Sequence, residues 1–215
     1  AQSETCLPVT CLTPADHFVD GQVADDRRLS SCGRPAPLCR IAIVDEDGAM
    51  LPPDEEGEIV VRSSGLMAGY YRDEAATAAA FTPDGWLRTG DIGRIDAEGF
   101  CTIVDRKKDM IVSGGFNVYS AEVEAAVIEH PAVADCAVIG IPDDKWGEAV
   151  CACVELRPGH TATADEILEH CRERLARFKA SKAVEFLPQL PKSAIGKVLK
   201  RALREKHWAG RGRRV

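Results

Sequence analysis

The stretch Pro191-Lys192-Ser193-Ala194-Ile195-Gly196-Lys197-Val198-Leu199-Lys200-Arg201 places Lys197 directly after a glycine, between a polar loop and a predicted amphipathic helix. A lysine in this setting can grip a phosphate group, or it can be one more cation on a solvated helix. A Walker phosphate loop would need a glycine five residues before Gly196 and Ser or Thr after Lys197, but Pro191 and Val198 stand there. These eleven residues alone favour a surface helix that starts at Lys197.

Four further stretches carry residues suited to binding an anion or a cation. Asp91 follows a glycine turn, and Arg106 lies at the far end of the predicted hairpin that starts at Asp91, so two adjacent strands can bring their side chains together. Ser113-Gly114-Gly115-Phe116-Asn117-Val118-Tyr119 contains two glycines that let the backbone approach a narrow ligand. Gln2-Ser3-Glu4-Thr5 adds a carboxylate and two hydroxyl groups near the first residue.

The first half of the sequence must position these residues with β-hairpins. Short β-branched runs separated by Asp- and Gly-rich turns predict two strand pairs. An alanine-rich stretch from Asp73 to Phe81 predicts a short helix with Asp73 as its N-cap. The predicted strands are residues 40–44 with 57–62 and residues 91–95 with 100–104.

After Arg106 the pattern changes to alternating helices and strands, which predicts a small α+β unit. Ser120 is the expected cap of a helix that runs to about His130 and ends before Pro131. The other predicted elements are strands over residues 134–140, 149–154 and 183–186 and a helix over residues 164–174.

The run Asp105-Arg106-Lys107-Lys108-Asp109 separates the two halves, because five consecutive charges make a poor core and a good connector. We therefore predict an α+β protein with a mostly β first part at residues 1–105, a small α+β part at 106–208 and a basic tail at 209–215. The connector can equally be a plain solvated linker.

Composition narrows the class of function. The net charge of −7 divides into −11 through Asp105 and +4 from Arg106 onward, so the second half attracts anions. Nucleic acid is not an expected partner, because the cationic run from Lys197 to Arg214 has no interleaved aromatic residue beyond Trp208. No apolar run is long enough to predict a membrane span.

The nine cysteines and five histidines lack the close pairing that zinc prefers. Cys136, Cys151 and Cys153 lie in apolar runs, which favours reduced, buried thiols and a cytoplasmic protein.

Taken in order, the stretches resemble the adenylate-forming superfamily of acyl-CoA synthetases, luciferases and peptide-synthetase adenylation domains. The resemblance runs from Ala1 to about Trp208 and is carried by many motifs in one order, which makes it specific. The motifs are Tyr70-Tyr71-Arg72 and residues 85–93, 105–124 and 191–204. Residues 109–119 and 142–148 are most similar to fatty- or aryl-acid:CoA ligases.

The resemblance implies a reaction in two steps. A carboxylate attacks the α-phosphate of ATP to give acyl-AMP and pyrophosphate, and the thiolate of coenzyme A then displaces AMP. Lys197 matches the lysine that catalyses adenylation, where a flexible ammonium group stabilises negative charge. Asp91 matches the aspartate that accepts both ribose hydroxyls, and Arg106 an arginine near ribose and phosphate. Glu4 matches the glutamate associated with Mg²⁺, and Ser3 a phosphate-contacting threonine.

The second step implies a domain rotation and a passage for the pantetheine arm. Lys108 matches the hinge about which the family's small C-terminal lid domain rotates. Gly114 and Gly115 match positions that line the passage. Trp146, Phe178 and Lys182 match positions that contact coenzyme A in some relatives, although Trp146 and Phe178 can also be read as core residues. Ala180 stands where a relative has a basic residue, which weakens the expected phosphate contact there.

The resemblance makes the first part the C-terminal end of a large AMP-binding domain, a β-hairpin or barrel-like remnant, with the rest of the enzyme upstream. The family's glycine-rich phosphate loop and acyl pocket are not in this sequence, so we expect no adenylation from these 215 residues alone. The expected ligands are ATP, Mg²⁺, coenzyme A and a small carboxylic acid of unassigned structure. Alternatives are an adenylating enzyme that passes the acyl group to a carrier protein or to oxygen, and a noncatalytic AMP- or CoA-binding module. Whether the protein forms a homo-oligomer is left open.

Overall fold

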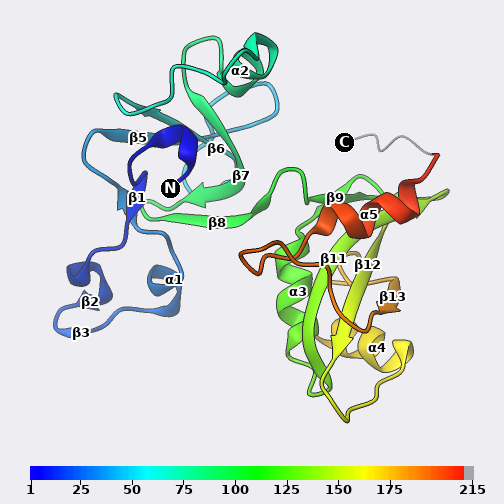
Figure 1. Ribbon diagram of the computed structural model, residues 1–215. Helices are drawn as coiled ribbons and strands as arrows, with labels where there is room; N and C mark the ends of the chain where they lie inside the picture. Colours follow the sequence, from blue (N-terminus) through cyan, green and yellow to red (C-terminus); the bar gives the residue numbers. More distant parts are fainter. Residues whose placement is uncertain (211–215) are drawn as a thin grey trace. The chain divides into compact units, whose positions relative to one another are not determined.

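The protein is described by a computed structural model over residues 1–210, which form two compact units (Figure 1). Unit 1 is Ala1–Lys107, and unit 2 begins at Lys108. Residues 211–215 of the predicted basic tail lie outside the described residues.

Unit 1 is built on a four-stranded antiparallel sheet in the order β5-β6-β7-β8. Both predicted hairpins are confirmed, because β5 pairs with β6 and β7 with β8 in antiparallel register. Buried Ile43, Ile59 and Cys101 form one apolar cluster of this unit, and Val44, Val60 and Trp86 form another. β7 begins at Leu87, so Asp91 lies inside a strand rather than at a turn.

The remaining elements of unit 1 are short. The Asp73 carboxylate accepts from the amide of Ala76 and caps α2, as predicted. The elements are η1 (Ser3–Thr5), β1 (Thr10–Cys11), η2 (Pro14–His17), β2 (Phe18–Val19), β3 (Gln22–Val23), α1 (Asp26–Leu29), β4 (Arg34–Pro35), β5 (Cys39–Val44), β6 (Gly57–Ser63), α2 (Glu74–Ala80), β7 (Leu87–Ile95) and β8 (Cys101–Arg106).

Unit 2 has a mixed sheet in which the long hairpin β11–β12 is central, and β13 adds to β12 in parallel. Helices α3 and α4 pack together and contact β11 and β13, while α5 packs on β11 (Figure 1). The elements are β9 (Ile111–Ser113), β10 (Phe116–Val118), α3 (Ser120–Ile128), β11 (Val133–Asp143), β12 (Gly147–Leu156), α4 (Ala164–Arg174), β13 (Ala183–Phe186) and α5 (Lys200–Trp208).

The two faces of the β11–β12 hairpin are both buried, which explains its near-continuous apolar sequence. Alternate residues serve different layers. Val138 and Ala152 belong to the cluster that contains α3 and α4 residues. Ile139 and Cys151 belong to the cluster that contains Leu203 of α5. The sheet is therefore the middle layer between two helical layers.

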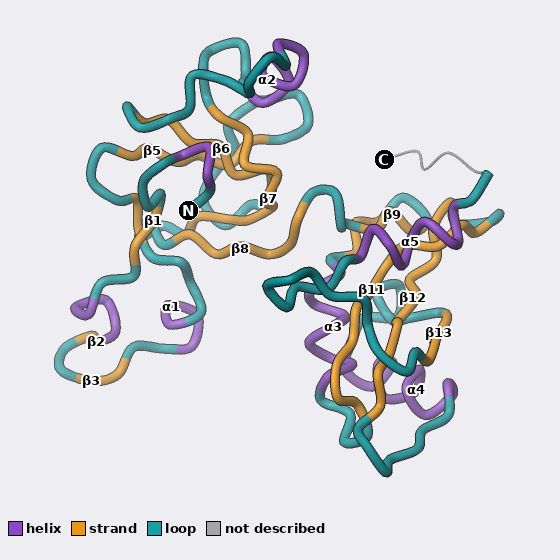
Figure 2. Tube along the Cα trace, viewed as in Figure 1, coloured by secondary structure: helices purple, strands orange, loops and turns teal. Residues whose placement is uncertain are grey.

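Two local predictions for unit 2 are wrong. Ser120 is the first residue of α3 rather than its cap, and Tyr119 stands at the N-cap position in extended conformation. The Ser120 hydroxyl instead accepts from Lys200 Nζ at 2.7 Å. The C-terminal helix α5 starts at Lys200 and is preceded by a loop (Figure 2). Lys197 lies in that loop.

The α+β class predicted from the sequence is confirmed. No sheet in residues 1–210 closes into a barrel, and the main sheet of the first part consists of the two β-hairpins β5–β6 and β7–β8. Over the same residues, no helix has the length and apolar character to cross a bilayer. All nine cysteines are unpaired thiols, and Cys136, Cys151 and Cys153 are buried as predicted.

Candidate functional site

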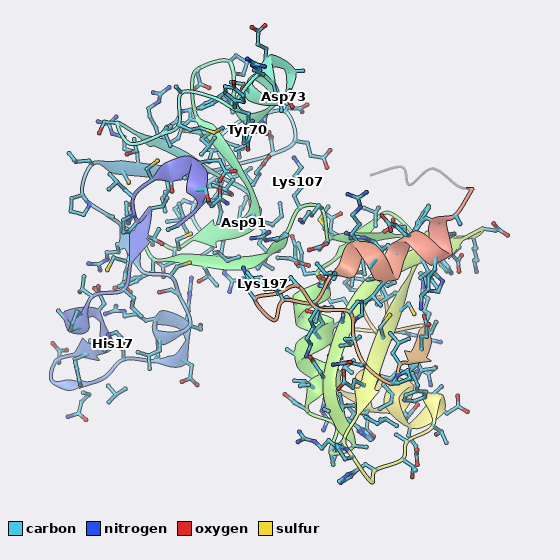
Figure 3. All side chains as sticks on the ribbon, in the orientation of Figure 1. His17, Tyr70, Asp73, Asp91, Lys107 and Lys197 are labelled. Carbon is cyan, nitrogen blue, oxygen red and sulfur yellow. The ribbon has the colours of Figure 1, made fainter. Side chains whose placement is uncertain are left out.

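Asp91 lies on β7 (Figure 3), and donors from two other segments hold its side chain. It pairs in register with Arg106 of β8, whose Nε lies 3.4 Å from Asp91 Oδ1. Gln2 Nε2 donates to Asp91 Oδ2 at 3.1 Å and to the carbonyl of Thr89 at 2.8 Å. A carboxylate has about four lone-pair positions, and Gln2 and Arg106 are the side-chain partners of Asp91 within residues 1–210, so about two positions remain for hydroxyl donors of a ligand.

Glu4 lies two residues after Gln2, in the short helix η1, and Ser3 is exposed in the same helix. The Tyr70 hydroxyl donates to Glu4 Oε1 at 3.1 Å. This hydrogen bond raises the pKa of Tyr70, because Glu4 stabilises the protonated phenol. Asp91 and Arg106 are thus joined, through Gln2, to the segment that carries Ser3 and Glu4.

The Glu4 carboxylate suits a Mg²⁺ ion that is bound together with a nucleotide. No group of three or more His, Cys, Asp or Glu side chains within residues 1–210 could cage a metal ion. Mg²⁺ usually takes one or two carboxylates, several waters and substrate phosphates, so a single glutamate suffices. Within residues 1–210, the Glu4 carboxylate is hydrogen-bonded only at Oε1. Its other oxygen, Oε2, is left for such an ion.

In unit 2, Trp146 lies over the glycine loop and beside two lysines. The ammonium groups of Lys145 and Lys182 are each 4.6 Å from the centre of its ring. A Cβ at Gly114 would lie 2.5 Å from Trp146 Cε3, so this glycine is needed for packing as well as for its φ of +63°. Gly115, with φ +83°, has open space where a side chain would start.

The turn that presents Trp146 is fixed by Asp143. Its Oδ1 accepts from the amides of Trp146 at 2.8 Å and Lys145 at 2.9 Å. These two hydrogen bonds lower the pKa of Asp143, because they favour the carboxylate. Lys182 Nζ also donates to Ser113 Oγ at 3.1 Å, which ties it to the glycine loop.

Phe178 forms an exposed aromatic pair with Phe116, with ring centroids 5.0 Å apart. Phe178 and Trp146 are each 41% exposed, so neither is a core residue. Ala180, by contrast, is buried and offers nothing to a phosphate.

The two residues at the division between the units are each bound to their own unit. Lys107 Nζ lies 3.0 Å from Glu58 Oε2, and Glu58 is buried and also pairs with Arg88 at 2.8 Å. On the other side, Arg204 of α5 donates to the carbonyl of Lys108 at 2.9 Å.

Lys197 lies in the loop before α5 and is exposed (Figure 3). Its ammonium group has no hydrogen-bond or ion-pair partner among residues 108–210. Of the residues that the resemblance assigns to coenzyme A, Gly114 and Lys182 contact Trp146. Phe178 pairs with Phe116. Those assigned to the nucleotide in unit 1 gather around Asp91 and Glu4.

Sequence reasoning gave no role to Gln2 or Tyr70, although both lie in stretches that carried the resemblance. It also missed Asp143 and Arg204, which act through contacts with Trp146 and Lys108. For Asp143 the residue type gave a weak signal, since an Asp side chain in a turn often accepts from the backbone amide two residues further on.

Comparisons with known proteins point in one direction. A family model described as AMP-binding enzyme matches residues 1–71, and one described as AMP-binding enzyme C-terminal domain matches residues 122–197. The medium/long-chain-fatty-acid–CoA ligase FadD8 of Mycobacterium tuberculosis is 45% identical over 221 residues, which cover 100% of this chain and 37% of the relative. The indoleacetate–CoA ligase of Aromatoleum aromaticum is 42% identical, covering 94% of this chain and 38% of the relative.

A solved structure extends this likeness. The o-succinylbenzoate CoA synthetase of Bacillus subtilis, in complex with its acyl-adenylate intermediate, has a TM-score of 0.82 and 38% identity over 94% of this chain and 40% of its own. The same synthetase has also been solved with ATP and a magnesium ion. The chain thus spans less than half the length of each of these relatives.

Proposed function

The chain belongs to the adenylate-forming superfamily of AMP-binding enzymes, and from this premise we propose that the protein acts as an ATP-dependent, AMP-forming acid:CoA ligase. Unit 1 is proposed as the C-terminal end of the AMP-binding domain, and unit 2 as the small C-terminal domain. The observation that carries this proposal is the placement of Asp91 between Gln2 and Arg106, beside the segment of Glu4.

In the first proposed step, a carboxylate oxygen of the acid attacks the α-phosphorus of ATP, and the bond from phosphorus to pyrophosphate breaks. Asp91 accepts hydrogen bonds from the ribose hydroxyl groups at its two remaining lone-pair positions. Arg106, half-exposed beside Asp91, adds positive charge near the ribose and phosphate. Bound at Glu4, Mg²⁺ would neutralise phosphate charge.

Lys197 is proposed to stabilise the charge that gathers between the carboxylate and the phosphate. Its ammonium group is exposed on a four-carbon stem, so it is available to a substrate rather than committed to an ion pair within unit 2. Such electrostatic stabilisation contributes about 10²–10³-fold for a single group.

In the second proposed step, the thiolate of coenzyme A attacks the acyl carbon, and the bond from carbon to the AMP oxygen breaks. Lys145 and Lys182 flank Trp146 and provide two cations for the phosphates of coenzyme A, while Trp146 and Phe178 provide exposed aromatic surface. Lys108 is proposed as the pivot between the two steps.

The proposal is tested on the full-length protein with ATP–pyrophosphate exchange, using octanoate, palmitate, benzoate and indole-3-acetate as acids. Thioester formation is followed as loss of the free thiol of coenzyme A. We expect at least one acid to support both reactions, and Lys197→Ala to slow exchange by about 10²-fold or more. Lys206→Ala is the matched control, because Lys206 lies on α5, near Lys197 in the sequence, and pairs with Glu185 of β13 as an ordinary surface cation. Unchanged exchange in Lys197→Ala would contradict the proposed role.

A further inference from the structure

The loop before α5 holds Lys197 through a single neighbouring residue, Ser193. Ser193 N donates to the carbonyl of Lys197 at 2.8 Å. Lys197 N donates in turn to Ser193 Oγ at 3.2 Å. The two polar groups of the Lys197 backbone are therefore both bound to the same serine.

The shape of this loop is a tight hairpin turn. Gly196 N donates to the carbonyl of Ser193 at 2.9 Å, and Gly196 has φ +81°. A type I turn followed by a left-handed glycine is a common three-residue hairpin loop, and serine is favoured at its first position. Ser193-Ala194-Ile195-Gly196 supplies both requirements, so the turn is encoded locally.

The base of the turn is attached firmly to unit 2. Lys192 and Val198 form an antiparallel bridge, and Lys192 Nζ lies 2.6 Å from Asp135 Oδ2 of β11. Leu190 is buried in the cluster under α5, and Val198 packs against the same cluster. On the far side, Lys200 Nζ lies 2.7 Å from Glu124 Oε1 of α3.

This arrangement combines a rigid base with an exposed tip. Ala194, Ile195, Gly196 and Lys197 are all exposed, and Ser193 is half-buried between them and the base. Fixing both backbone groups of Lys197 fixes the direction of its Cα–Cβ bond, so only the flexible stem has to be ordered when the ammonium group meets a substrate.

We propose that Ser193 is a positioning residue for Lys197, and that its hydroxyl group is needed for the adenylation step but not for thioester formation. The inference rests on the function proposed above for Lys197. Under the proposed rotation about Lys108, Lys197 leaves the reacting carboxyl group before the thiol attacks, so loss of its orientation should leave the second step unaffected.

The two steps are measured separately in the full-length protein. Adenylation is followed by ATP–pyrophosphate exchange with the most active acid of the panel, and thioester formation is followed from the synthetic acyl-adenylate and coenzyme A. We expect Ser193→Ala to slow exchange by about tenfold to a hundredfold, since an ångström of misplacement can have that effect. We expect it to change thioester formation by less than about twofold.

Two further variants separate orientation from general damage to the fold. Ser193→Thr keeps the hydroxyl acceptor and should restore most of the exchange rate. Gly196→Ala adds a Cβ that meets nothing within 4 Å but strains the positive φ, so it should slow exchange without removing any hydrogen-bonding side chain. Thr161→Ala, at an exposed position elsewhere in unit 2, is the control for loss of a hydroxyl group.

The outcomes distinguish this inference from the proposed function. If Lys197→Ala abolishes exchange while Ser193→Ala keeps it within twofold of the natural protein, Ser193 does not position Lys197 and the proposed function stands. If Ser193→Ala slows both steps equally and lowers the melting temperature, the serine is merely structural and the inference is also wrong. If Lys197→Ala leaves exchange intact, the proposed function itself fails.

Discussion

Replacement of Arg204 by alanine tests whether an ion pair stabilises the start of unit 2. Arg204 lies 2.9 Å from Asp109 Oδ1 and donates to the carbonyl of Lys108 at 2.9 Å. The two paired side chains are only 13% and 12% exposed. Within residues 1–210, Asp109 Oδ1 is buried and has no aligned hydrogen-bond donor, so the guanidinium charge is what compensates it.

The expected effect follows from this burial. Removing one partner of a buried ion pair lowers the free energy of unfolding by about 3–5 kcal/mol, because an uncompensated charge is left behind. Both side chains keep some contact with water, so we expect the lower end of this range, about 3 kcal/mol. This loss corresponds to a decrease of roughly a hundredfold in the folding equilibrium constant. Arg201→Ala is the matched control. Arg201 is on the same helix, 2.8 Å from Glu205, but its side chain is 88% exposed, so we expect a loss of at most about 0.5 kcal/mol.

Urea unfolding followed by tryptophan fluorescence measures the difference. The chain has three tryptophans, of which Trp86 is in unit 1, so a Trp86→Phe background lets Trp146 and Trp208 report on unit 2. This matters because two compact units can unfold in separate transitions. A double-mutant cycle with Asp109→Asn should give a coupling energy of about 2 kcal/mol. The reasoning is refuted if Arg204→Ala unfolds like Arg201→Ala or if the coupling energy is near zero.

Three other outcomes are expected. Asp91→Asn removes a charged acceptor and should raise the KM for ATP of the full-length protein by about tenfold, whereas an unchanged KM would contradict the ribose contact. Ile139→Ala leaves a cavity in the cluster under α5 and should lower the free energy of unfolding of unit 2 by about 2–5 kcal/mol in urea; a loss below 1 kcal/mol would show that the site collapses. The pKa of His130 is lowered by burial and by the charges of His170, whose ring centre lies 5.1 Å away, and Arg174, while Glu166 acts in the opposite direction. The unfolded chain therefore binds the proton more readily than the folded one, and the stability should fall as the pH drops below 6.5. His130→Gln should flatten that pH dependence, and an identical pH profile in this variant would assign it to other groups.

Much of the local structure could be predicted because short-range interactions determine it. The helix α4 spans Ala164–Arg174 as predicted, and its N-cap Thr163 forms a reciprocal capping box with Glu166. The strands β11 and β12 were found from their apolar runs, which two buried faces require. Ser120 misled the prediction because a serine at a helix start is usually a cap, whereas here its hydroxyl is engaged by Lys200, 80 residues away.

The sequence by itself thus determined the α+β class, most elements and the residues that carry the superfamily resemblance. Only the tertiary structure decided which side chains meet. Gln2 reaches Asp91 across 89 residues, and Arg204 reaches the Lys108 carbonyl across 96. Such contacts depend on strand register, including the irregularity between Ile92 and Gly93, and on how helices pack over the sheet. Residue type shows that a group can donate or accept a hydrogen bond, but the packed backbone selects its partner.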